Sequence, residues 1–406
     1  KMTTTINNEH KKLNVPNLRF PEFQGEWKRT IFKNVITLQR GSSPRPIIEY
    51  VTTSDDGVNW IKIGDMPHFG RIVTSTEEKI TKEGAKKSRQ VNKGDLILSN
   101  SMSYGLPYIM GIDGYIHDGW FVLKNFENTF DKDYLCNLLI SRAIQNQYKR
   151  LAAGGVVQNI SSDLVNSVSV SIPTMMEQKK ISSLLNLIDE RIATQNKIIE
   201  DLKKLKSAII DYVINSLNTD FAKFGSLYEM AGEGGTPTTS NASFYDNGKI
   251  PFIKIDDLKK KYLTENKDFI TELGLQKSSA WLVPTHSILF SNGATIGEIS
   301  ITTYPVCTKQ GILGIVPKQN IDVEFLYYFM SSSYFKKAVS RIVTEGTMKT
   351  AYLKDINNIL CPIPTKEKQQ EIAKMPSALN SKIDFEQSIL KLFCSQKQYL
   401  LRQMFI

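Results

Sequence analysis

The sequence contains a long segment that occurs twice, and any fold of the chain has to accommodate both copies. Residues 172–213 begin IPTMMEQKKI, and residues 363–404 begin with the similar IPTKEKQQEI. Aligned without a gap, the two segments are offset by 191 positions, the difference between Gln369 and Gln178. Self-similarity over this length predicts that the chain is built from two units of the same plan.

Both copies carry the apolar spacing of a coiled coil. Apolar side chains recur in steps of three and four residues, which places them along one face of a helix. Polar residues interrupt the stripe at matching positions, Gln195 and Lys206 in the first copy and Glu386 and Lys397 in the second. About 40 residues at a rise of 1.5 Å form a rod of roughly 60 Å, and so narrow a stripe on so long a rod requires a partner. We therefore expect the two helices to pair in antiparallel orientation through Leu185, Ile188, Ile192, Ile199, Leu202, Ile209, Val213, Ile383, Leu390, Phe393, Leu400 and Met404.

Prolines mark the start of each helix, and one further proline departs from the pattern. Pro173 and Pro364 stand directly before the two helices, where proline is favoured. Pro376 lies inside the second helix, where a proline removes a backbone hydrogen bond and clashes with the preceding turn. The second helix is therefore expected to start late or to bend near Met375. The alternative to pairing is two amphipathic helices, each packed on its own domain, but the matched polar interruptions favour the pair.

The repeat also covers the regions before the helices. Residues 61–66 match residues 253–258, and the turn at residues 41–44 matches that at residues 234–237. Short apolar runs between glycine-rich turns predict mostly short strands. The predicted fold class is α+β: two strand-rich α/β domains in tandem, each followed by a long helix, with the helices paired as an antiparallel coiled coil. The expected divisions are a disordered leader at 1–17, a first domain at 18–172, a helix at 173–217, a second domain at 218–363 and a helix at 364–406.

One helix is expected inside each domain. Asp131 is placed to cap the start of such a helix, because its side chain can accept from the free N–H groups of the first turn. Apolar residues from Leu135 to Tyr148 then predict a single continuous element. Asp322 begins its counterpart in the second domain.

Composition and missing motifs narrow the class of protein. The chain is globular, with 41% hydrophobic and 23% charged residues, and no apolar run reaches the length of a membrane span. Lys and Arg exceed Asp and Glu by 51 to 41, which favours a polyanionic partner. Four widely spaced cysteines fit neither a zinc site nor a disulfide framework and indicate a reducing cytoplasm.

Signatures of catalysis are missing as well. The sequence has no Walker A motif, no GxGxxG, no two adjacent prolines as an amino-methyltransferase motif requires, and no Pro-Asp dipeptide of the common nuclease type. His117 beside Asp118 would suit a general base, but a loop histidine next to an aspartate is far more often polar surface. We therefore expect no catalytic residue and no bound metal.

Loops at the ends of the predicted strands carry side chains suited to DNA. Arg and Lys can hold phosphates, and Arg, Asn and Gln can pair with two atoms of a guanine or adenine edge. For any single residue a solvated loop position is more frequent than a DNA contact, so the prediction rests on clustering at matching places in both halves. The candidates are Arg40, Ser42, Ser43, Arg45, Lys62, Lys86, Lys87, Arg89, Ser99, Asn100, Ser101, Ser103, Tyr104, Lys149, Arg150, Gln158, Asn159, Thr236, Thr238, Thr239, Ser240, Lys254, Lys277, Ser291, Asn292, Thr295, Lys309, Gln310, Arg341, Lys349 and Thr350.

This organisation resembles a known family, the specificity subunits of type I restriction–modification systems. That family has the order target-recognition domain, conserved helix, target-recognition domain, conserved helix. The resemblance covers nearly the whole chain from Leu18 onward, and the second copy departs from the first by having Lys368 where the first has Glu177. It is carried by the duplicated motif that opens each helix, Ile172-Pro173…Glu177-Gln178…Ile181 and Ile363-Pro364…Gln369…Ile372.

The resemblance implies that each domain reads one half of a split target on double-stranded DNA, and that the helices set the gap between the half-sites. It implies that the helices dock two methyltransferase subunits, which supply S-adenosylmethionine chemistry on adenine N6. Two motor-nuclease subunits, using ATP and Mg²⁺, would join for cleavage. This chain would itself bind no cofactor and catalyse nothing, and it would act in the bacterial cytoplasm at the nucleoid.

Two other interpretations come from different classes of protein. A coiled-coil scaffold joining two protein-interaction domains would not bind DNA; the positive charge and the basic loops argue against it, and a DNA affinity that falls steeply with salt would exclude it. An enzyme with its own methyltransferase or nuclease activity would need the cofactor and metal signatures that the sequence lacks.

Overall fold

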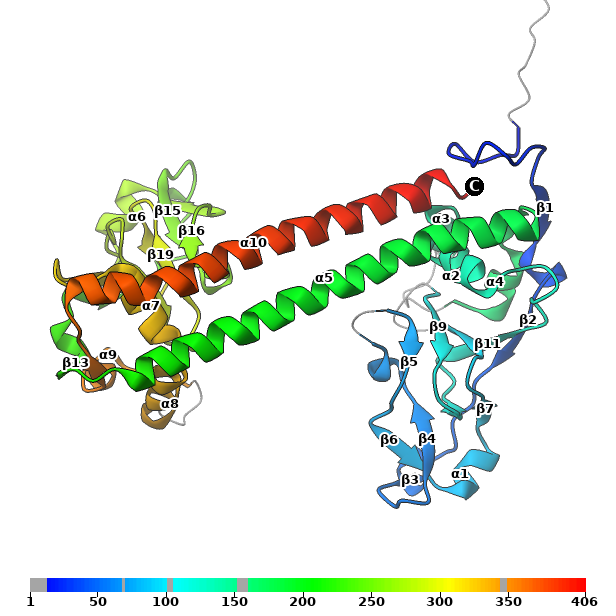
Figure 1. The fold of residues 1–406 in the computed structure, drawn as a ribbon, viewed down its shortest axis with the longest axis horizontal. Helices are drawn as coiled ribbons and strands as arrows, with labels where there is room; N and C mark the ends of the chain where they lie inside the picture. Colours follow the sequence, from blue (N-terminus) through cyan, green and yellow to red (C-terminus); the bar gives the residue numbers. More distant parts are fainter. Residues whose placement is uncertain (1–12, 68–69, 101–104, 152–159, 344–348) are drawn as a thin grey trace, which may run out of the picture. The chain divides into compact units, whose positions relative to one another are not determined.

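The computed structural model describes residues 13–67, 70–100, 105–151, 160–343 and 349–406. By its internal contacts the chain divides into two units, residues 1–197 with 388–406 and residues 198–387. Each unit holds one strand-rich domain and parts of two long helices, α5 (Met175–Ser216) and α10 (Lys366–Gln403) (Figure 1).

The first domain is built around a five-stranded sheet with the order β2-β11-β8-β9-β5. All four residues of β8 are buried, as expected of a strand covered on both faces. Leu96 and Leu98 belong to the core shared with the helices, whereas Ile97 belongs to a core shared with the second sheet. The strands are β2 (Thr37–Arg40), β11 (Trp120–Lys124), β8 (Leu96–Ser99), β9 (Pro107–Met110) and β5 (Ile72–Val73).

The second sheet of this domain has the order β3-β6-β4-β10-β7. A separate antiparallel pair, β1 with β12, joins the start of the domain to the segment directly before α5. These elements are β3 (Val51–Thr52), β6 (Glu78–Ile80), β4 (Val58–Ile61), β10 (Gly114–Ile116), β7 (Arg89–Val91), β1 (Lys28–Ile31), β12 (Ser169–Ile172) and the short helix α1 (Lys82–Lys86).

The second domain repeats the plan. Its main sheet, β14-β21-β18-β19-β16, connects its strands in the same order as the first, and its second sheet, β17-β15-β20, has three strands. The pair β13 with β22 again joins the start of the domain to the segment before a long helix, here α10. The elements are β14 (Tyr228–Glu233), β21 (Ile312–Pro317), β18 (Ile288–Ser291), β19 (Ile299–Thr302), β16 (Tyr262–Leu263), β17 (Asp268–Ile270), β15 (Ile250–Ile253), β20 (Cys307–Thr308), β13 (Phe221–Lys223), β22 (Leu360–Pro362) and α6 (Glu272–Gln276).

The expected single helix inside each domain is two helices, so that prediction is wrong. Asp131 does cap the first, accepting from the N–H of Tyr134. The chain then turns to an extended conformation at Ser141, and at Ser332 in the second domain. Serine favours this break because its hydroxyl can cap the next helix, as Ser332 does for Phe335. The helices are α2 (Lys132–Ile140), α3 (Arg142–Leu151), α4 (Ser162–Ser167), α7 (Val323–Ser331), α8 (Ser333–Ile342) and α9 (Leu353–Ile356).

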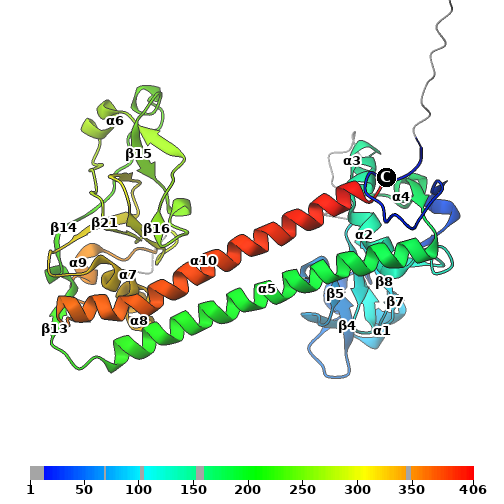
Figure 2. The same ribbon diagram turned by 45° about the horizontal axis from the view of Figure 1, so that its top comes forward.

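Within each unit the two long helices lie side by side (Figures 1 and 2). In the first unit the start of α5 meets the end of α10, and Ile181, Leu185 and Leu400 enter the core of the first domain. In the second unit the end of α5 meets the start of α10, and Ile210 and Ile372 enter the core of the second domain. The helices therefore pair in antiparallel orientation, and each pair of ends is buried by a domain.

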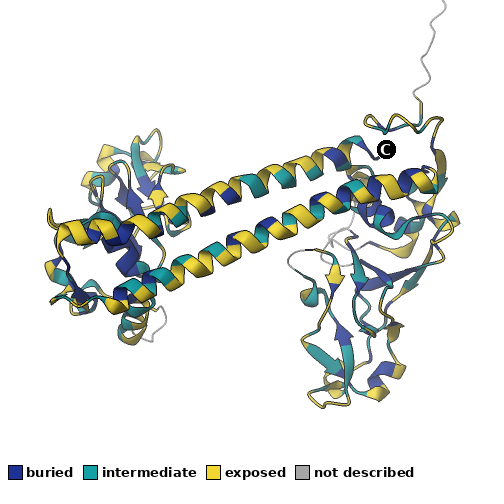
Figure 3. Ribbon diagram, in the orientation of Figure 1, coloured by how far each residue is buried: buried dark blue, intermediate teal, exposed yellow. Residues whose placement is uncertain are grey.

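Burial follows the predicted stripe along both helices (Figure 3). Near its end, the stripe of α5 shifts: Ile210 and Ile214 are each 5% exposed, while Ile209 and Val213 are half-buried. The shift arises because this end is covered by the second domain as well as by α10. Of the other predicted pairing residues, the buried ones are Leu185, Ile188, Ile199, Ile383, Leu400 and Met404, and the half-buried ones are Ile192, Leu202, Leu390 and Phe393.

Pro376 lies inside α10, which begins ten residues earlier at Lys366. Of the two expected outcomes, a late start or a bend near Met375, the late start is therefore excluded. The proline leaves the carbonyl of Ile372 without its usual helical partner. Packing compensates, because Pro376 is buried at the stripe position that Leu185 occupies in the first copy, and Ala373 is buried against the second domain. Tertiary packing of this kind supplies most of a helix's stability in a folded protein.

The glutamine of the duplicated motif fastens each long helix to its domain. Gln178 accepts a 2.9 Å hydrogen bond from the N–H of Asp131 and donates to the carbonyls of Thr129 and Pro173. Gln369 makes the three corresponding bonds, accepting from the N–H of Asp322 and donating to the carbonyls of Asn320 and Pro364. Each glutamine thus links the first turn of a long helix to the cap of a domain helix.

A cation from the first domain reaches the long helices beside it. Arg71, directly before β5, donates to Asn137 of α2 at 3.0 Å and to Asp189 of α5 at 2.9 Å. The Asp189 carboxylate also binds Lys397 of α10 at 2.5 Å. One carboxylate therefore joins the domain, α5 and α10.

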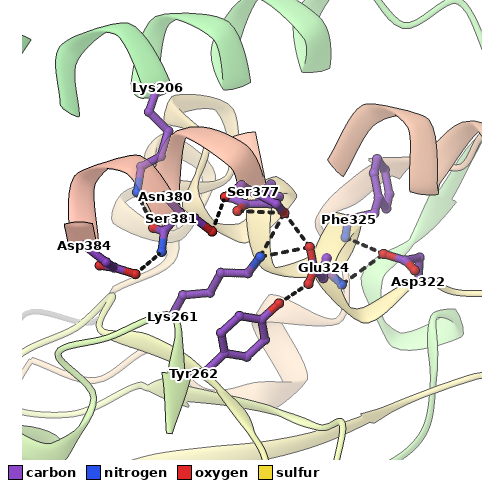
Figure 4. Close-up of polar contacts among 11 residues, drawn as sticks. Lys206, Lys261, Tyr262, Asp322, Glu324, Phe325, Ser377, Asn380, Ser381 and Asp384 are labelled. Carbon is purple, nitrogen blue, oxygen red and sulfur yellow. Dashed lines mark hydrogen bonds and ion pairs between the residues drawn. The ribbon is translucent and has the colours of Figure 1, made fainter. Parts of the chain in front are cut away.

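Lys261 stands in the corresponding place of the second domain, directly before β16 (Figure 4). Its side chain is 2% exposed, and its ammonium lies 2.8 Å from Glu324 of α7 and 2.9 Å from Ser377 of α10. The ammonium also lies over the rings of Tyr262 and Tyr328. A buried charge is tolerated here because a carboxylate and aromatic faces surround it.

The segment before β1, residues 13–27, forms an arm across the start of α5. Of the expected leader at 1–17, residues 1–12 lie outside the described residues, whereas residues 13–17 contact the first unit: Asn14 donates to the carbonyl of Trp27 at 2.6 Å, and Pro16 is buried. The N–H of Leu18 donates to the carbonyl of Gln403 at 3.0 Å, so the arm also touches the end of α10.

Candidate nucleic-acid interface

The loop after the first main-sheet strand of each domain begins at a glycine where any Cβ would clash. A Cβ on Gly41 would lie 2.0 Å from the carbonyl oxygen of His117, and a Cβ on Gly234 would lie 2.2 Å from the hydroxyl of Thr308. Glycine permits this close approach of two backbones. The matching glycines therefore bring both predicted polar loops against the end of a strand of the second sheet.

The structure gathers four predicted residues of the first domain around Asp118. The hydroxyl of Ser43 donates to one carboxylate oxygen at 2.8 Å, and Arg45 reaches the other at 3.2 Å. Arg40 donates to the Asp118 carbonyl at 3.4 Å, and Arg89 donates to the carbonyl of Arg40 at 3.1 Å. The Arg45 side chain is 79% exposed, so its guanidinium can leave Asp118 for a phosphate or a base edge at little cost.

A hollow of about 890 Å³ opens beside this cluster. Ser43, Arg45, Lys62 and His117 supply its polar lining, and its other lining residues include Pro44, Pro46, Ile47, Trp60 and Ile63. A lining of both apolar and polar side chains suits the mixed edge of a base pair, which presents methyl groups as well as donors and acceptors.

His117 contributes a defined donor to this hollow. Burial lowers the pKa of His117 below its usual value, so the ring is neutral at pH 7. Its Nδ1 accepts a 2.8 Å hydrogen bond from the N–H of Gly119, which places the remaining proton on Nε2.

The second domain brings together a corresponding set. The N–H of Gln310 donates to the hydroxyl of Thr236 at 3.3 Å, and the N–H of Lys309 donates to the carbonyl of Ile253, the residue before Lys254. Lys254 pairs with Asp268 at 2.8 Å, as Lys62 pairs with Glu78 at 2.7 Å in the first domain. Both domains therefore present a polar loop, a lysine and a strand end in the same arrangement.

Four predicted DNA contacts lie inside the domains instead. The Asn100 side chain donates to the carbonyl of Asp118, and Asn292 donates to the carbonyl of Ala351. Ser99 and Ser291 are also buried, at the ends of the central strands β8 and β18. Because they are buried and bonded within the protein, these side chains hold loops in place and are removed from the set available to a base edge.

The remaining candidates differ in exposure and position. Lys149 and Arg150 lie in the last turn of α3, and no hydrogen bond or ion pair within the described residues joins them to the Asp118 cluster. Arg341 lies in the last turn of α8 in the second domain. Ser101, Ser103, Tyr104, Gln158 and Asn159 lie outside the described residues. The exposed candidates are Lys86, Lys87, Lys149, Arg150, Thr238, Thr239, Ser240, Lys254, Lys277, Thr295, Lys309, Gln310, Arg341 and Lys349, and the half-buried ones are Ser42, Thr236 and Thr350.

The sequence prediction did not place His117 and Asp118 in the interface. A signal was present, because β10 and β20 hold the same position in their sheets and are followed by His117-Asp118 and Lys309-Gln310 respectively. Only the second dipeptide was predicted, since its residue types are more typical of DNA contacts.

Within the described ranges, no three His, Cys, Asp or Glu side chains gather as a metal site would require. No helix in that part of the chain is long and apolar enough to cross a membrane. Each of the two domains therefore presents a polar loop of the same kind, and the two domains share the helices α5 and α10.

Comparison with known proteins identifies the class. The family described as type I restriction modification DNA specificity domain matches the chain twice, at residues 25–204 and 218–392. The specificity subunit of type I restriction enzyme MjaIX from Methanocaldococcus jannaschii is 23% identical over 388 residues and is covered over 88% of each chain. The HindI specificity subunit from Haemophilus influenzae is 23% identical over 344 residues, which are 65% of this chain and 74% of that one.

Solved structures show the same fold. The S subunit of a type I restriction–modification system from M. genitalium superposes with a TM-score of 0.54 at 16% identity, covering 97% of this chain and 99% of that chain. A chain from a structure of the assembly and conformational transition of the type I system superposes with a TM-score of 0.60 at 15% identity, covering 92% of this chain and 96% of that chain. The chain therefore belongs to the family of type I restriction–modification specificity subunits, whose members are not themselves catalytic.

Proposed function

We propose that this chain recognises a bipartite target on double-stranded DNA, with one half-site read by each domain. The observation that carries the proposal is the repetition of one polar arrangement, Ser43 with Lys62 and Thr236 with Lys254, on two domains of a DNA specificity family. The two sets differ in side chains, since Arg45 and His117 stand where the second domain has Thr238 and Lys309. Different side chains at equal positions favour two unrelated half-site sequences.

The chain would act as part of a larger complex. It would direct two methyltransferase subunits that use S-adenosylmethionine on adenine N6, and two motor-nuclease subunits that use ATP and Mg²⁺, while binding none of these cofactors itself. Its place of action would be the nucleoid of a bacterial cytoplasm.

Methylome sequencing tests the proposal. A methylation-free bacterial host would carry this chain with its neighbouring methyltransferase, and a control host would carry the methyltransferase alone. Methyladenine in a split motif, found only with this chain, is the expected result. No new mark from a complex that forms in a pull-down would overturn the proposal and favour the scaffold interpretation.

The role of the helices in spacing can be tested in the same host. Adding seven residues to both α5 and α10 preserves the phase of the apolar stripe and lengthens each helix by about 10.5 Å. At 3.4 Å per base pair, the gap between half-sites should grow by about three base pairs while both half-site sequences stay the same. An unchanged gap would contradict the assignment of spacing to the helices.

A further inference from the structure

The first repeat shows what covers the start of a long helix. In the arm, Arg19 binds the Glu177 carboxylate through two nitrogens, at 2.8 and 2.9 Å. Glu22 pairs with Lys180, whose ammonium also lies 4.9 Å from the centre of the Phe20 ring. Phe20 packs against the core cluster that contains Ile181, Leu185 and Met404. The arm therefore binds the start of α5 through the aromatic ring of Phe20, which lies in sequence between the cation Arg19 and the anion Glu22.

The second repeat has no such arm, because only residues 217–220 separate α5 from β13. At the position that the arm covers in the first repeat, the second has an open hollow of about 640 Å³, which we name the helix-start hollow. Shifted by one repeat, Glu177 corresponds to Lys368 and Lys180 to Glu371, and both of these lie on the hollow. Its apolar lining includes Ile209, Val213, Leu217, Ile372, Met375 and Pro376.

We propose that the helix-start hollow binds an extended peptide segment of a partner protein that has an aromatic residue between an acidic and a basic residue. The aromatic ring would occupy the apolar lining, as Phe20 does in the first repeat. The acidic residue would precede it and pair with Lys368, and the basic residue would follow and pair with Glu371. This inference goes beyond DNA recognition and does not depend on it.

The order of charges excludes a second copy of this chain as the occupant. In the arm, Arg19 meets an anion and Glu22 meets a cation. Placed in the helix-start hollow, Arg19 would face Lys368 and Glu22 would face Glu371, and like charges in contact are unfavourable. The fitting segment has the reversed order.

Both the apolar and the charged side chains of the hollow are available to a ligand. Met375 is 58% exposed, and a flexible apolar side chain adapts to the ring it covers. Lys368 and Glu371 at present pair with each other at 2.9 Å, with side chains 52% and 64% exposed. An exposed pair of this kind contributes little, so exchanging it for two ligand pairs costs little.

The test uses two fluorescein-labelled peptides and the full chain. One peptide has the sequence of residues 14–24, NVPNLRFPEFQ. The other carries Arg19→Glu and Glu22→Lys. In fluorescence anisotropy the charge-reversed peptide should bind saturably and at least ten-fold more tightly than the native-sequence peptide.

Variants of the chain test whether the peptide binds at the helix-start hollow. Met375→Glu should weaken binding of the charge-reversed peptide at least ten-fold, whereas Met176→Glu, which changes a 76% exposed methionine outside the hollow, should not. The double change Lys368→Glu with Glu371→Lys should invert the preference between the two peptides, a result that loss of folding cannot produce. Equal binding of both peptides, no saturable binding, or no inversion would overturn the proposal.

Discussion

The ammonium of Lys397 lies 2.5 Å from the carboxylate of Asp189 and so joins the end of α10 to the start of α5. One repeat away, the corresponding residues are Lys206 and Asn380, and these too are joined, at 2.9 Å. The duplicated sequence therefore places a lysine against a polar residue in both units, within a largely apolar seam that Gln195 and Glu386 also interrupt. A polar pair in an apolar seam is satisfied in only one register, so these two contacts specify how the helices align.

Replacing Lys206 and Asn380 together by leucine should stabilise the second unit. Well-packed apolar residues often match or exceed a buried polar pair, so we expect a gain of about 1–2 kcal/mol in the free energy of unfolding. Asn380→Leu alone should instead cost about 1–2 kcal/mol, because it leaves Lys206 without its acceptor. Urea denaturation measures both, with Lys204→Leu at an exposed position of α5 as control; a destabilised double variant would contradict the argument.

Stability should also depend on pH through Lys206. Burial lowers the pKa of Lys206 below its ordinary value of 10.5. The unfolded chain therefore binds more protons than the folded chain between these two pKa values, and stability rises with pH across that window. The difference in unfolding free energy between the natural chain and Lys206→Met should thus shift in favour of the natural chain as the pH approaches 10.5. A difference that is constant with pH would show that this lysine is not desolvated.

Arg71→Ala should make the length of the gap between the half-sites variable, without changing the sequence of either half-site. Arg71 ties the first domain to Asp189, and its loss leaves that domain freer to rotate on the helices. In the methylome we expect marks at more than one gap length with both half-site sequences retained. Lys204→Ala, which removes an exposed ion pair on α5, is the matched control and should keep a single gap. Degeneracy within a half-site, at a constant gap, would assign Arg71 to base reading instead.

The architecture could be predicted from the sequence because the repeat shows which distant segments, the two long helices, pair with each other. Once Gln178 is matched to Gln369, the antiparallel pair and the two-domain plan follow from helix spacing and the need to bury a stripe. Local sequence patterns predicted the helices wrongly at positions where tertiary contacts determine the conformation. Ser141 interrupts a helix that its apolar spacing predicts to be continuous, and Pro376 is tolerated because packing holds it.

The interface was predicted less completely, for a physical reason. Asn100 has the chemistry of a base-reading residue, and only its burial reveals that it bonds a loop of its own domain. His117 and Asp118 have the chemistry of ordinary surface, and only the fold shows that they organise Arg45 beside a hollow. Residue type alone does not distinguish these cases, because burial and neighbours come from contacts distant in sequence.

The cysteines should differ sharply in reactivity. Burial raises the pKa of the Cys136 and Cys307 thiols to about 11 and that of Cys361 higher still, whereas Cys394 is half-buried on α10. The thiolate is the reactive form, so iodoacetamide at pH 8 should label Cys394 first in the folded chain. Peptide mass spectrometry measures the order, and urea should make all four sites label at similar rates. Rapid labelling of Cys136 without urea would contradict its burial in the core.

Gln178→Ala should destabilise the first unit, because the side chain is buried between α5 and the first domain. The side chain satisfies the N–H of Asp131 and two carbonyls, and leaving such groups without partners costs about 2–3 kcal/mol. Gln178→Glu should cost at least as much, because it keeps one acceptor, loses both donors and buries a charge. Gln369→Ala should have the same effect on the second unit, and the exposed Gln276→Ala should have almost none. Denaturant unfolding of the four variants measures these changes in the free energy of unfolding. An unchanged free energy for Gln178→Ala would mean that the motif glutamine has a role other than the attachment of helix to domain.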